Sequence, residues 1–345
     1  MGKIDILFLN KSDIEKMDLS AEEVLDAVEK GLLAQGNNQT VIEPRVHLFP
    51  DPQYDPNDPN PDGKYHGHWN ILRGYIEPLG VAGVKVIGDY VYNYEKELPS
   101  EMATLLLFDP GTGAPRAIID ATEITNMRTG ALTALGAKYL ARKQNNVLGQ
   151  LGAGGTAWYN VVYLDSLYNF KEIRVSSRRP ESREEFARRL SEYLGKPVKA
   201  VSTSEECLKG ADIMVESTRL IEPQVLFKTE WVKPGNFVVP YGSVSCVELS
   251  LTDVMDKVVV DDVKQCFECK RYGSLRRHVD TGKISPDSIH GELGEIVAGK
   301  KPGRENDQER ILFWHRGMSL SDIALGELVC LKAQKEGLGV TLNYI

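Results

Sequence analysis

The chain has 345 residues, of which 42% are hydrophobic and 26% are charged, and its formal net charge at pH 7 is −8. These values are ordinary for a globular protein with one large or two smaller domains, and they exclude a disordered or fibrous chain. The acidic balance argues against a nucleic-acid-binding protein, whose binding surface would be basic.

Membrane insertion and secretion are not expected. No apolar run approaches the roughly 18–20 residues that a membrane-spanning helix needs. The first residues, MGKIDILFLNKSDIEKM, are interrupted by charge and do not resemble a signal peptide. Five cysteines are sparse and odd in number for a disulfide scaffold, so reduced thiols and a cytoplasmic location are expected.

The first part of the chain predicts a helix followed by an antiparallel sheet. Apolar spacing predicts a helix over 11–35, in which Ser20 and Glu23 form a capping box that restarts it. Residues 50–63 contain five prolines and predict an irregular loop. Strands are expected at 72–76, 81–87, 104–108 and 114–119, with a hairpin turn at 109–113 and a helix at 123–142.

The middle of the chain alternates short apolar strands with amphipathic helices. Strands are expected at 147–151, 173–176, 213–217, 237–240 and 258–260, with helices at 156–168 and 182–194. This alternation predicts an α/β fold in which helices cover both faces of a parallel sheet. The tail is expected to add a strand at 311–314 and a helix at 319–336.

A glycine-rich turn between the strand at 147–151 and the next helix predicts a dinucleotide site. It contains Gly152, Gly154, Gly155, Thr156 and Ala157, and it fits G-x-G-x-x-(G/A). The first glycine allows the tight turn, the second lets the backbone approach a pyrophosphate, and the small residue lets helix and strand pack closely. The alternative is a glycine turn with only a structural role.

The next strand ends in Ser177, Arg178 and Arg179, where NAD-binding enzymes usually carry an acid. A hydroxyl and two guanidinium groups suit a 2′-phosphate, so NADP(H) is favoured as cofactor while NAD(H) stays open. The alternative is that one arginine merely stacks on the adenine.

Three cations are candidates for substrate chemistry. Strand alternation places Lys85 on the face opposite Val84 and Val86. By default such a residue is a solvated strand lysine, and truncating it would change the stability by no more than about 0.5 kcal/mol. Arg45 would by default be a surface charge. Arg128 lies in an apolar, small-residue helix, and a buried guanidinium needs an anion from the protein or from a ligand.

Metal and redox sites are not expected. His66 and His68 have no acid or cysteine cluster near them in the sequence, which makes a poor metal site. Cys266 and Cys269 form one CxxC with no second pair, and we interpret them as two reduced thiols on a helix.

In this order, the motifs resemble the ornithine cyclodeaminase/μ-crystallin family, which includes archaeal alanine dehydrogenases and ketimine reductases. The matching stretches are Pro44-Arg45, Gly83-Val84-Lys85, Asp109-x-x-Thr112-Gly113-x-Pro115, Thr125-x-x-Arg128-Thr129-Gly130-Ala131, Gly152-x-Gly154-x-x-Ala157, Glu292-Leu293-Gly294-Glu295-Ile296-Val297-x-Gly299-x-x-Pro302-Gly303-Arg304 and Gly317-x-x-x-x-Asp322. They span most of the chain.

The resemblance implies a Rossmann-type NAD(P)-binding domain over 123–314 and a mixed α+β substrate and dimerisation domain from 1–122 and 315–345. It implies that Arg45 and Arg128 hold the substrate carboxylate, that Lys85 is catalytic, and that Asp322 belongs to the cofactor site. It also implies a homodimer that acts on a small amino or imino acid, or on a 2-oxo acid plus an amine.

One departure from the family pattern bears on the reaction. Cyclodeaminases carry an acid after the fifth strand of the nucleotide domain, but residues 240–249 contain no Asp, and Ser243 is expected to stand in its place at the substrate. We therefore predict an NAD(P)H-dependent imine reductase or amino-acid dehydrogenase. A cyclodeaminase-type lyase using bound NAD and a non-catalytic ligand-binding or accessory protein are the alternatives.

Overall fold

The computed structural model describes residues 3–50, 67–220, 223–268 and 273–345, and the chain divides into two compact units. Unit 1 comprises Met1–Arg128 and Met318–Ile345, and unit 2 comprises Thr129–Gly317. The division falls within helix α3 (Thr122–Leu140). The substrate and cofactor roles of the two domains, and their boundaries at 122/123 and 314/315, stay predictions.

Unit 1 is built on an eight-stranded sheet in the order β16-β1-β7-β6-β5-β4-β2, with β3 also paired to β4. All described pairs in it are antiparallel except β1 with β7. The strands are β1 (Asp5–Leu9), β2 (Thr40–Ile42), β3 (Val46–Leu48), β4 (His68–Ile76), β5 (Val81–Asp89), β6 (Glu101–Phe108), β7 (Pro115–Asp120) and β16 (Val340–Asn343). The helices are α1 (Lys11–Lys16), α2 (Ala21–Gly36) and α10 (Ser319–Glu336), with short turns η1 (Glu77–Leu79) and η2 (Val91–Lys96).

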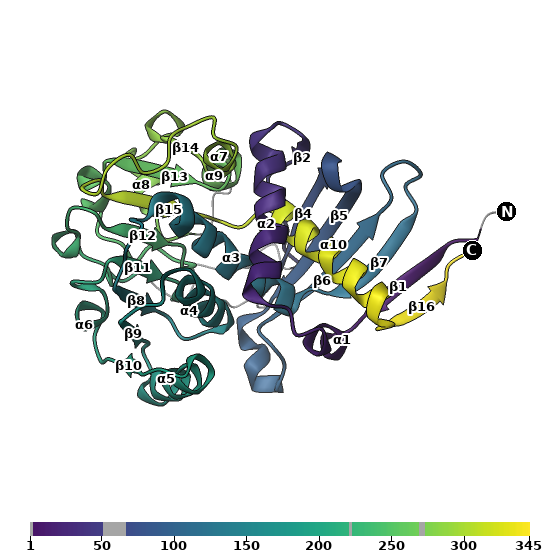
Figure 1. The fold of residues 1–345 in the computed structure, drawn as a ribbon, viewed down its shortest axis with the longest axis horizontal. Helices are drawn as coiled ribbons and strands as arrows, with labels where there is room; N and C mark the ends of the chain where they lie inside the picture. The colour runs from purple at the N-terminus through teal and green to yellow at the C-terminus, as the bar shows by residue number, and fades with distance from the viewer. Residues whose placement is uncertain (1–2, 51–66, 221–222, 269–272) are drawn as a thin grey trace. The chain divides into compact units, whose positions relative to one another are not determined.

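Helix α10 covers one face of this sheet, crossing β4, β5 and β6 and packing beside α2 (Figure 1). Glycines allow the close approach, because a Cβ on Gly83 would lie 2.7 Å from Ile323 and one on Gly326 would lie 2.3 Å from Leu105. The buried residues of β5 alternate from Val81 onward, so the odd-numbered side chains form the face under α10. This packing brings residues of the two chain ends into one core.

The single helix predicted over 11–35 is wrong, because the chain breaks between α1 and α2. Asp18 has φ +45°, a left-handed conformation that ends the first helix. The restart at Ser20 is confirmed: its hydroxyl accepts from the N–H of Glu23 at 3.2 Å, and the Glu23 carboxylate accepts from the N–H of Ser20 at 2.9 Å. The capping box therefore marks the true start of α2.

Unit 2 contains a parallel sheet in the order β10-β9-β8-β11-β12-β15-β13-β14. The strand order reverses between β8 and β11, which is the switch point of a doubly wound sheet. The strands are β8 (Val147–Leu151), β9 (Glu172–Ser176), β10 (Val198–Ala200), β11 (Ile213–Glu216), β12 (Phe237–Pro240), β13 (Lys257–Val260), β14 (Gly291–Glu292) and β15 (Ile311–Trp314). The helices are α4 (Gly155–Tyr168), α5 (Pro180–Leu194), α6 (Ser204–Leu208), α7 (Val263–Glu268), α8 (Arg276–Asp280) and α9 (Leu293–Val297), with η3 (Thr229–Trp231), η4 (Leu251–Val254) and η5 (Pro286–Ser288).

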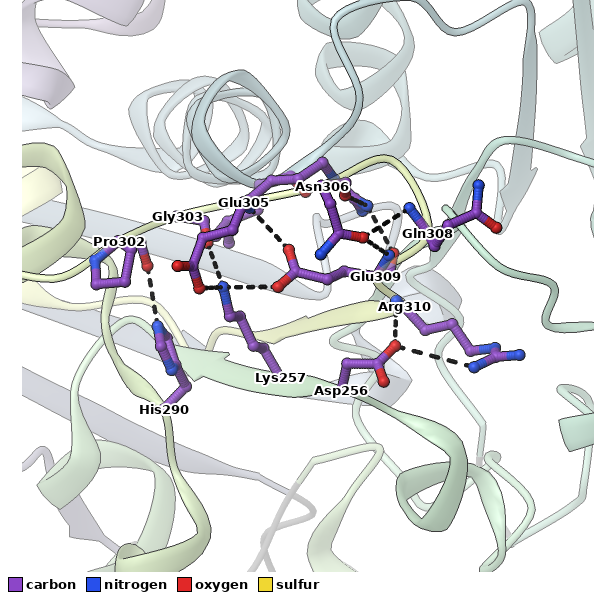
Figure 2. A network of polar contacts seen from close by, with 12 residues as sticks. Asp256, Lys257, His290, Pro302, Gly303, Glu305, Asn306, Gln308, Glu309 and Arg310 are labelled. Atoms are coloured by element: carbon purple, nitrogen blue, oxygen red, sulfur yellow. Dashed lines mark hydrogen bonds and ion pairs between the residues drawn. The ribbon is translucent and has the colours of Figure 1, made fainter.

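The motif that begins at Glu292 and ends at Arg304 leads into a loop that is held by buried Lys257 (Figure 2). The Nζ of Lys257, on β13, lies 2.7 Å from the carbonyl of Gly303, 2.6 Å from Glu305 and 2.9 Å from Glu309. The Nε of Arg304 donates to the carbonyl of Leu140 at 2.8 Å. These contacts give the end of the motif a structural role, namely to fix the segment that leads into β15.

Candidate active site

Lys85 lies in the interior of unit 1, with 0% of its side chain exposed. Strand alternation was read correctly, since Lys85 and Val84 point to opposite faces, but the solvated alternative for Lys85 is wrong. The face that carries Lys85 is the one covered by α10, while Val84 and Val86 lie on the half-exposed face. Truncating this lysine would therefore leave a cavity, at a cost of about 2–5 kcal/mol rather than the small change expected at a surface.

Asp322 is the partner of both buried cations. Its Oδ1 lies 2.5 Å from the Nζ of Lys85 and 2.8 Å from the Nε of Arg128. The hydroxyl of Thr125 lies 3.2 Å from the same Nζ and donates to the carbonyl of Ala121. The structure thus supplies the anion that a buried Arg128 requires, and Asp322 is the residue that the sequence assigned to the cofactor.

Two oxygens of Asp322 have different surroundings. Oδ1 accepts from both Lys85 and Arg128, whereas Oδ2 is buried and has no hydrogen-bond partner among the described residues. An unsatisfied buried carboxylate oxygen is costly, and it is relieved when a ligand donates a hydrogen bond to it. The assignment of Asp322 to the cofactor stays a prediction, but its observed ion pairs are with Lys85 and Arg128.

The pKa of Lys85 is lowered from 10.5 to about 7. Burial is the largest cause because it penalises the charged ammonium, and the positive charges of Arg128 and Arg45 lower the pKa further. The Asp322 carboxylate opposes these effects through its charge and its hydrogen bond. A lysine with a pKa near 7 can both give and take a proton at neutral pH.

Arg45 joins this group from the segment between β2 and β3. Val46 of β3 is paired with Ile71 of β4, so the preceding residue, Arg45, lies near Leu72. Leu72 is in turn paired with Lys85 of β5. Arg45 is half-buried, and its charge is felt by Lys85. Unit 1 therefore brings together Lys85, Arg128 and Arg45, the three cations selected from the sequence.

The glycine-rich turn of unit 2 fits a dinucleotide pyrophosphate. Gly152 has φ +101°, and a Cβ there would lie 2.8 Å from the carbonyl of Ser217, so only glycine suits this turn. Gly154 is the N-cap of α4 and makes no side-chain cap, and a Cβ on it would meet no atom within 4 Å. Thr156 lies in the first turn of α4, where exposed Gly155 begins the helix, and Ala157 is fully buried. The turn thus offers uncapped N–H groups beside open space.

A buried polar network that the sequence did not reveal supports this turn. The Nε2 of Gln150 donates to the carbonyl of Leu151 at 2.7 Å and to the hydroxyl of Ser217 at 2.8 Å. The Nδ2 of Asn160 donates to the Gln150 Oε1 at 3.1 Å and to the Tyr241 hydroxyl at 2.8 Å. Strand β8 and helix α4 are therefore tied to the residues that directly follow β11 and β12.

Ser177, Arg178 and Arg179 follow β9 directly. Ser177 is half-buried, and its hydroxyl lies 3.2 Å from the carbonyl of Arg179. Arg178 and Arg179 are exposed, and within the described residues neither guanidinium has an ion-pair partner. Arg183, which the sequence analysis did not single out, donates to the carbonyl of Ser177 at 3.3 Å and so supports this segment.

Ser243 lies in the loop after β12. Its N–H donates to the carbonyl of Thr218 at 3.1 Å, and its carbonyl accepts from the N–H of Gly273 at 2.9 Å. Its hydroxyl oxygen is buried without a hydrogen-bond partner in the described part of the chain. The backbone of Ser243 is thus held at two points, while its role at the substrate stays a prediction.

The cysteines and histidines singled out from the sequence are only partly described. Cys266 is buried in α7, and burial raises the pKa of its thiol well above the usual value, so it is unreactive. His68 is buried in β4. Cys269 and His66, with most of the proline-rich segment 50–63, lie outside the described residues. Among the residues that are described, no group of three or more His, Cys, Asp or Glu side chains could hold a metal ion.

A parallel sheet with its glycine-rich turn at the switch point defines the class of dinucleotide-binding α/β proteins. The chain belongs to the ornithine cyclodeaminase/mu-crystallin family, whose model matches residues 6–337. The predicted family and fold class, a Rossmann-type unit with a mixed α+β unit, are confirmed.

Three relatives indicate the chemistry of the similar proteins. An alanine dehydrogenase of Archaeoglobus fulgidus is 28% identical, with 99% of each chain covered. The structure of Thermococcus litoralis Δ1-pyrroline-2-carboxylate reductase with NADH and L-proline is 30% identical, has a TM-score of 0.88, and covers 97% of this chain and 99% of that one. An archaeal alanine dehydrogenase dimer with bound NAD is 27% identical, has a TM-score of 0.87, and covers 99% and 100%. The predicted enzyme class, an oxidoreductase acting on C=N or CH–NH2 groups, is confirmed.

In the described residues, no helix is long and apolar enough to span a membrane.

Proposed function

We propose that this protein is an NAD(P)H-dependent imine reductase or amino-acid dehydrogenase that acts at the α-carbon of a small amino or imino acid. The observation that carries the proposal is a fully buried Lys85 whose pKa is about 7, surrounded by Arg128, Arg45 and Asp322. A buried lysine in a structural ion pair, such as Lys257, keeps a raised pKa, whereas a proton donor with a pKa near neutral pH is suited to catalysis.

In this proposal, Arg45 and Arg128 bind the substrate carboxylate, because guanidinium groups pair with carboxylates through two parallel hydrogen bonds. Lys85 in its protonated form gives a proton to the nitrogen of the imine as the C=N bond becomes a C–N bond. In the opposite direction, neutral Lys85 removes a proton from the amine. A bound nicotinamide cofactor supplies or takes up the hydride at the α-carbon. One imino acid, one hydride and one proton thus give one amino acid.

Asp322 holds Lys85 and Arg128 in place through its Oδ1. Its second oxygen, buried and without a partner among the described residues, is suited to accept a hydrogen bond from the substrate nitrogen. In that arrangement Asp322 would orient the imine as well as its proton donor.

For the cofactor, we propose a preference for NADP(H) over NAD(H). The support is the pair of exposed guanidinium groups on Arg178 and Arg179 beside the Ser177 hydroxyl, where an acid would otherwise bind the ribose hydroxyls of NAD. The similar structures with bound NADH or NAD leave this preference to be tested on this chain.

We propose that two copies form a dimer through the face of the unit 1 sheet opposite α10. The support is a row of apolar residues that are paired across four strands, Phe8 with Ile118, Ile118 with Leu106 and Leu106 with Val84, each at least partly exposed. An exposed apolar row of this kind usually marks an interface. A dimer is also the form in which a similar alanine dehydrogenase is described. The expected cytoplasmic location stays a prediction.

The test is to follow NADPH and NADH oxidation with a panel of 2-oxo acids plus ammonia or methylamine, together with cyclic imines and iminosuccinate. Lys85→Met keeps most of the buried volume while removing the proton donor, so it separates catalysis from packing. On the best substrate, we expect it to lower kcat by about 10²–10⁴-fold, the usual contribution of a general acid. Wild-type turnover by a folded Lys85→Met variant would refute the catalytic role.

Ornithine separates the reductase from the lyase alternative. Without an Asp in 240–249 to serve as base, ornithine should not be converted to proline at a meaningful rate. Binding of substrate-like acids without cofactor oxidation on any member of the panel would instead favour the non-catalytic alternative.

A further inference from the structure

Glu216 is the last residue of β11 and is fully buried. It is paired with Leu151, the last residue of β8, in the register of the two strands that flank the switch point. Its backbone carbonyl accepts from the N–H of Tyr241, the first residue after β12. Glu216 therefore stands at the carboxyl edge of the sheet, next to the start of the glycine-rich turn.

The carboxylate of Glu216 joins three segments that are far apart in the sequence. Its Oε1 accepts from the N–H of Thr218 at 2.7 Å and from the Thr218 hydroxyl at 2.6 Å. Its Oε2 accepts from the N–H of Gly242 at 3.1 Å and from the hydroxyl of Ser274 at 2.6 Å. A Cβ on Gly242 would lie 2.3 Å from the Glu216 carboxylate, so glycine is required there for the contact.

Donors that reach both oxygens favour an ionised carboxylate at Glu216. Each oxygen accepts from one backbone N–H, a group that can only donate, and lies within hydrogen-bond distance of one hydroxyl. The Ser274 hydroxyl also lies 3.1 Å from the carbonyl of Gly242, so it ties the segment after β12 to the same carboxylate. Within the described residues, no lysine, arginine or histidine forms an ion pair with Glu216. The result is a buried negative charge that is balanced by neutral donors and held in one position.

The place of this charge follows from the geometry of a doubly wound sheet. A dinucleotide lies across the carboxyl edge at the switch point, with its pyrophosphate at the glycine-rich turn after β8 and its adenine ribose at the end of β9. The nicotinamide half then extends in the other direction, over the ends of β11 and β12. These are the two strands whose following segments Glu216 ties together.

We infer that Glu216 is a positioning residue of the cofactor site, which fixes the segments after β11 and β12 and stabilises the positively charged, oxidised nicotinamide. This inference rests on the proposed dinucleotide-dependent function. The reduced nicotinamide ring is uncharged and the oxidised ring carries one positive charge, so a fixed anion beside it favours the oxidised form. Favouring the oxidised form increases the driving force for hydride donation to an imine.

The experiment measures the dissociation constants of the oxidised and reduced cofactor separately, by calorimetry and by the fluorescence of the reduced ring. The pair used is NADP+ and NADPH or NAD+ and NADH, whichever the wild-type protein binds more tightly. Glu216→Gln should weaken the oxidised form by about tenfold, the order expected for unit charges several ångströms apart in a partly buried site, and the reduced form by less than about threefold. Equal weakening of both forms would overturn the charge role and leave only a structural tie.

Ser274→Ala is the matched control, because it removes one donor to the same carboxylate but keeps the negative charge. Its ratio of oxidised to reduced affinity should equal that of the wild-type protein, and a shift as large as that of Glu216→Gln would contradict the inference. If Glu216→Gln does not fold, Glu216→Thr tests the same point, since threonine suits a strand and its hydroxyl can accept a hydrogen bond.

The outcome also separates this inference from the proposed function. A wild-type protein that binds neither cofactor form would contradict both. A wild-type protein that binds both forms, with an unchanged affinity ratio in the folded Glu216 variant, would contradict the role of Glu216 alone.

Discussion

The carboxylate of Asp322 lies 2.5 Å from the ammonium of Lys85, and both side chains are fully buried in unit 1. The same carboxylate oxygen also accepts from Arg128 at 2.8 Å, so one anion is shared by two cations. The pKa of Lys85 reflects this competition: burial and the two arginines lower it, Asp322 raises it, and the result is about 7. Changing Asp322 or Arg128 should therefore shift the pH dependence of the reaction, in opposite directions for the two residues.

Asp322→Asn should shift the pH profile of imine reduction to lower pH. Reduction needs protonated Lys85, so kcat/KM for the wild-type enzyme should fall as pH rises through about 7. Asp322 raises the pKa of Lys85, and removing its charge lets burial and Arg128 lower that pKa further. The profile of kcat/KM from pH 5 to 9 measures the midpoint, and a midpoint at or above that of the wild-type enzyme would contradict the assignment.

Arg128→Gln should shift the same profile to higher pH, because the guanidinium lowers the pKa of Lys85. This variant should also raise the KM of the substrate more than it lowers kcat, since a carboxylate is held in the ground state and in the transition state alike. Opposite shifts in Asp322→Asn and Arg128→Gln would be hard to obtain from a general loss of structure. A shift to lower pH in both variants would indicate that Lys85 is not the titrating group.

Several turns, strands and helices of the fold could be predicted from the local sequence alone. The strand at 147–151 and the helix at 319–336 follow from apolar periodicity. The turn at Gly152 follows from a backbone geometry that only glycine tolerates. The hairpin around Asp109 is confirmed, with the N–H of Thr112 bonded to the Asp109 carboxylate at 2.8 Å. Each of these features is determined within a few residues of chain.

Features that depend on distant partners were missed. Strand β16 has only exposed residues and forms by pairing with β1, so its sequence carries no burial pattern that predicts it. The apolar run 6–9 of β1 was a local signal that was not used. The burial of Lys85 depends on α10, which lies more than 200 residues later in the chain. Strand alternation therefore predicts which side chains share the face of Lys85, but not that α10 covers this face. Glu216 carries no motif, and only the folded loops around it reveal its four donors.

Arg178→Ala should weaken NADPH binding by roughly 1–3 kcal/mol, the range for a hydrogen bond to a charged group, while NADH binding should barely change. The reason is that only NADPH carries the 2′-phosphate. The dissociation constants of both cofactors, measured for the wild-type protein and the variant, give the comparison. Arg188, an exposed arginine on α5 that pairs with Glu185, offers a control, since Arg188→Ala should leave both constants unchanged. Equal losses for NADPH and NADH in Arg178→Ala would show that the guanidinium only stacks on the adenine or supports the fold.

Leu106→Arg should break the proposed dimer. Leu106 lies in the centre of the apolar row on the open sheet face, paired with Val84 on one side and Ile118 on the other. Burying an unpaired guanidinium at the centre of an interface is strongly unfavourable, whereas a half-exposed strand position in a monomer tolerates it at little cost.

Leu331→Arg is the matched control, because Leu331 is also a leucine, 54% exposed, but lies on α10 away from this face. Light scattering should give about twice the 38.4 kDa chain mass for the wild-type protein and for Leu331→Arg, and about 38.4 kDa for Leu106→Arg. A wild-type protein that is itself a monomer would contradict the dimer, and a Leu106→Arg variant that stays dimeric would place the interface on another surface.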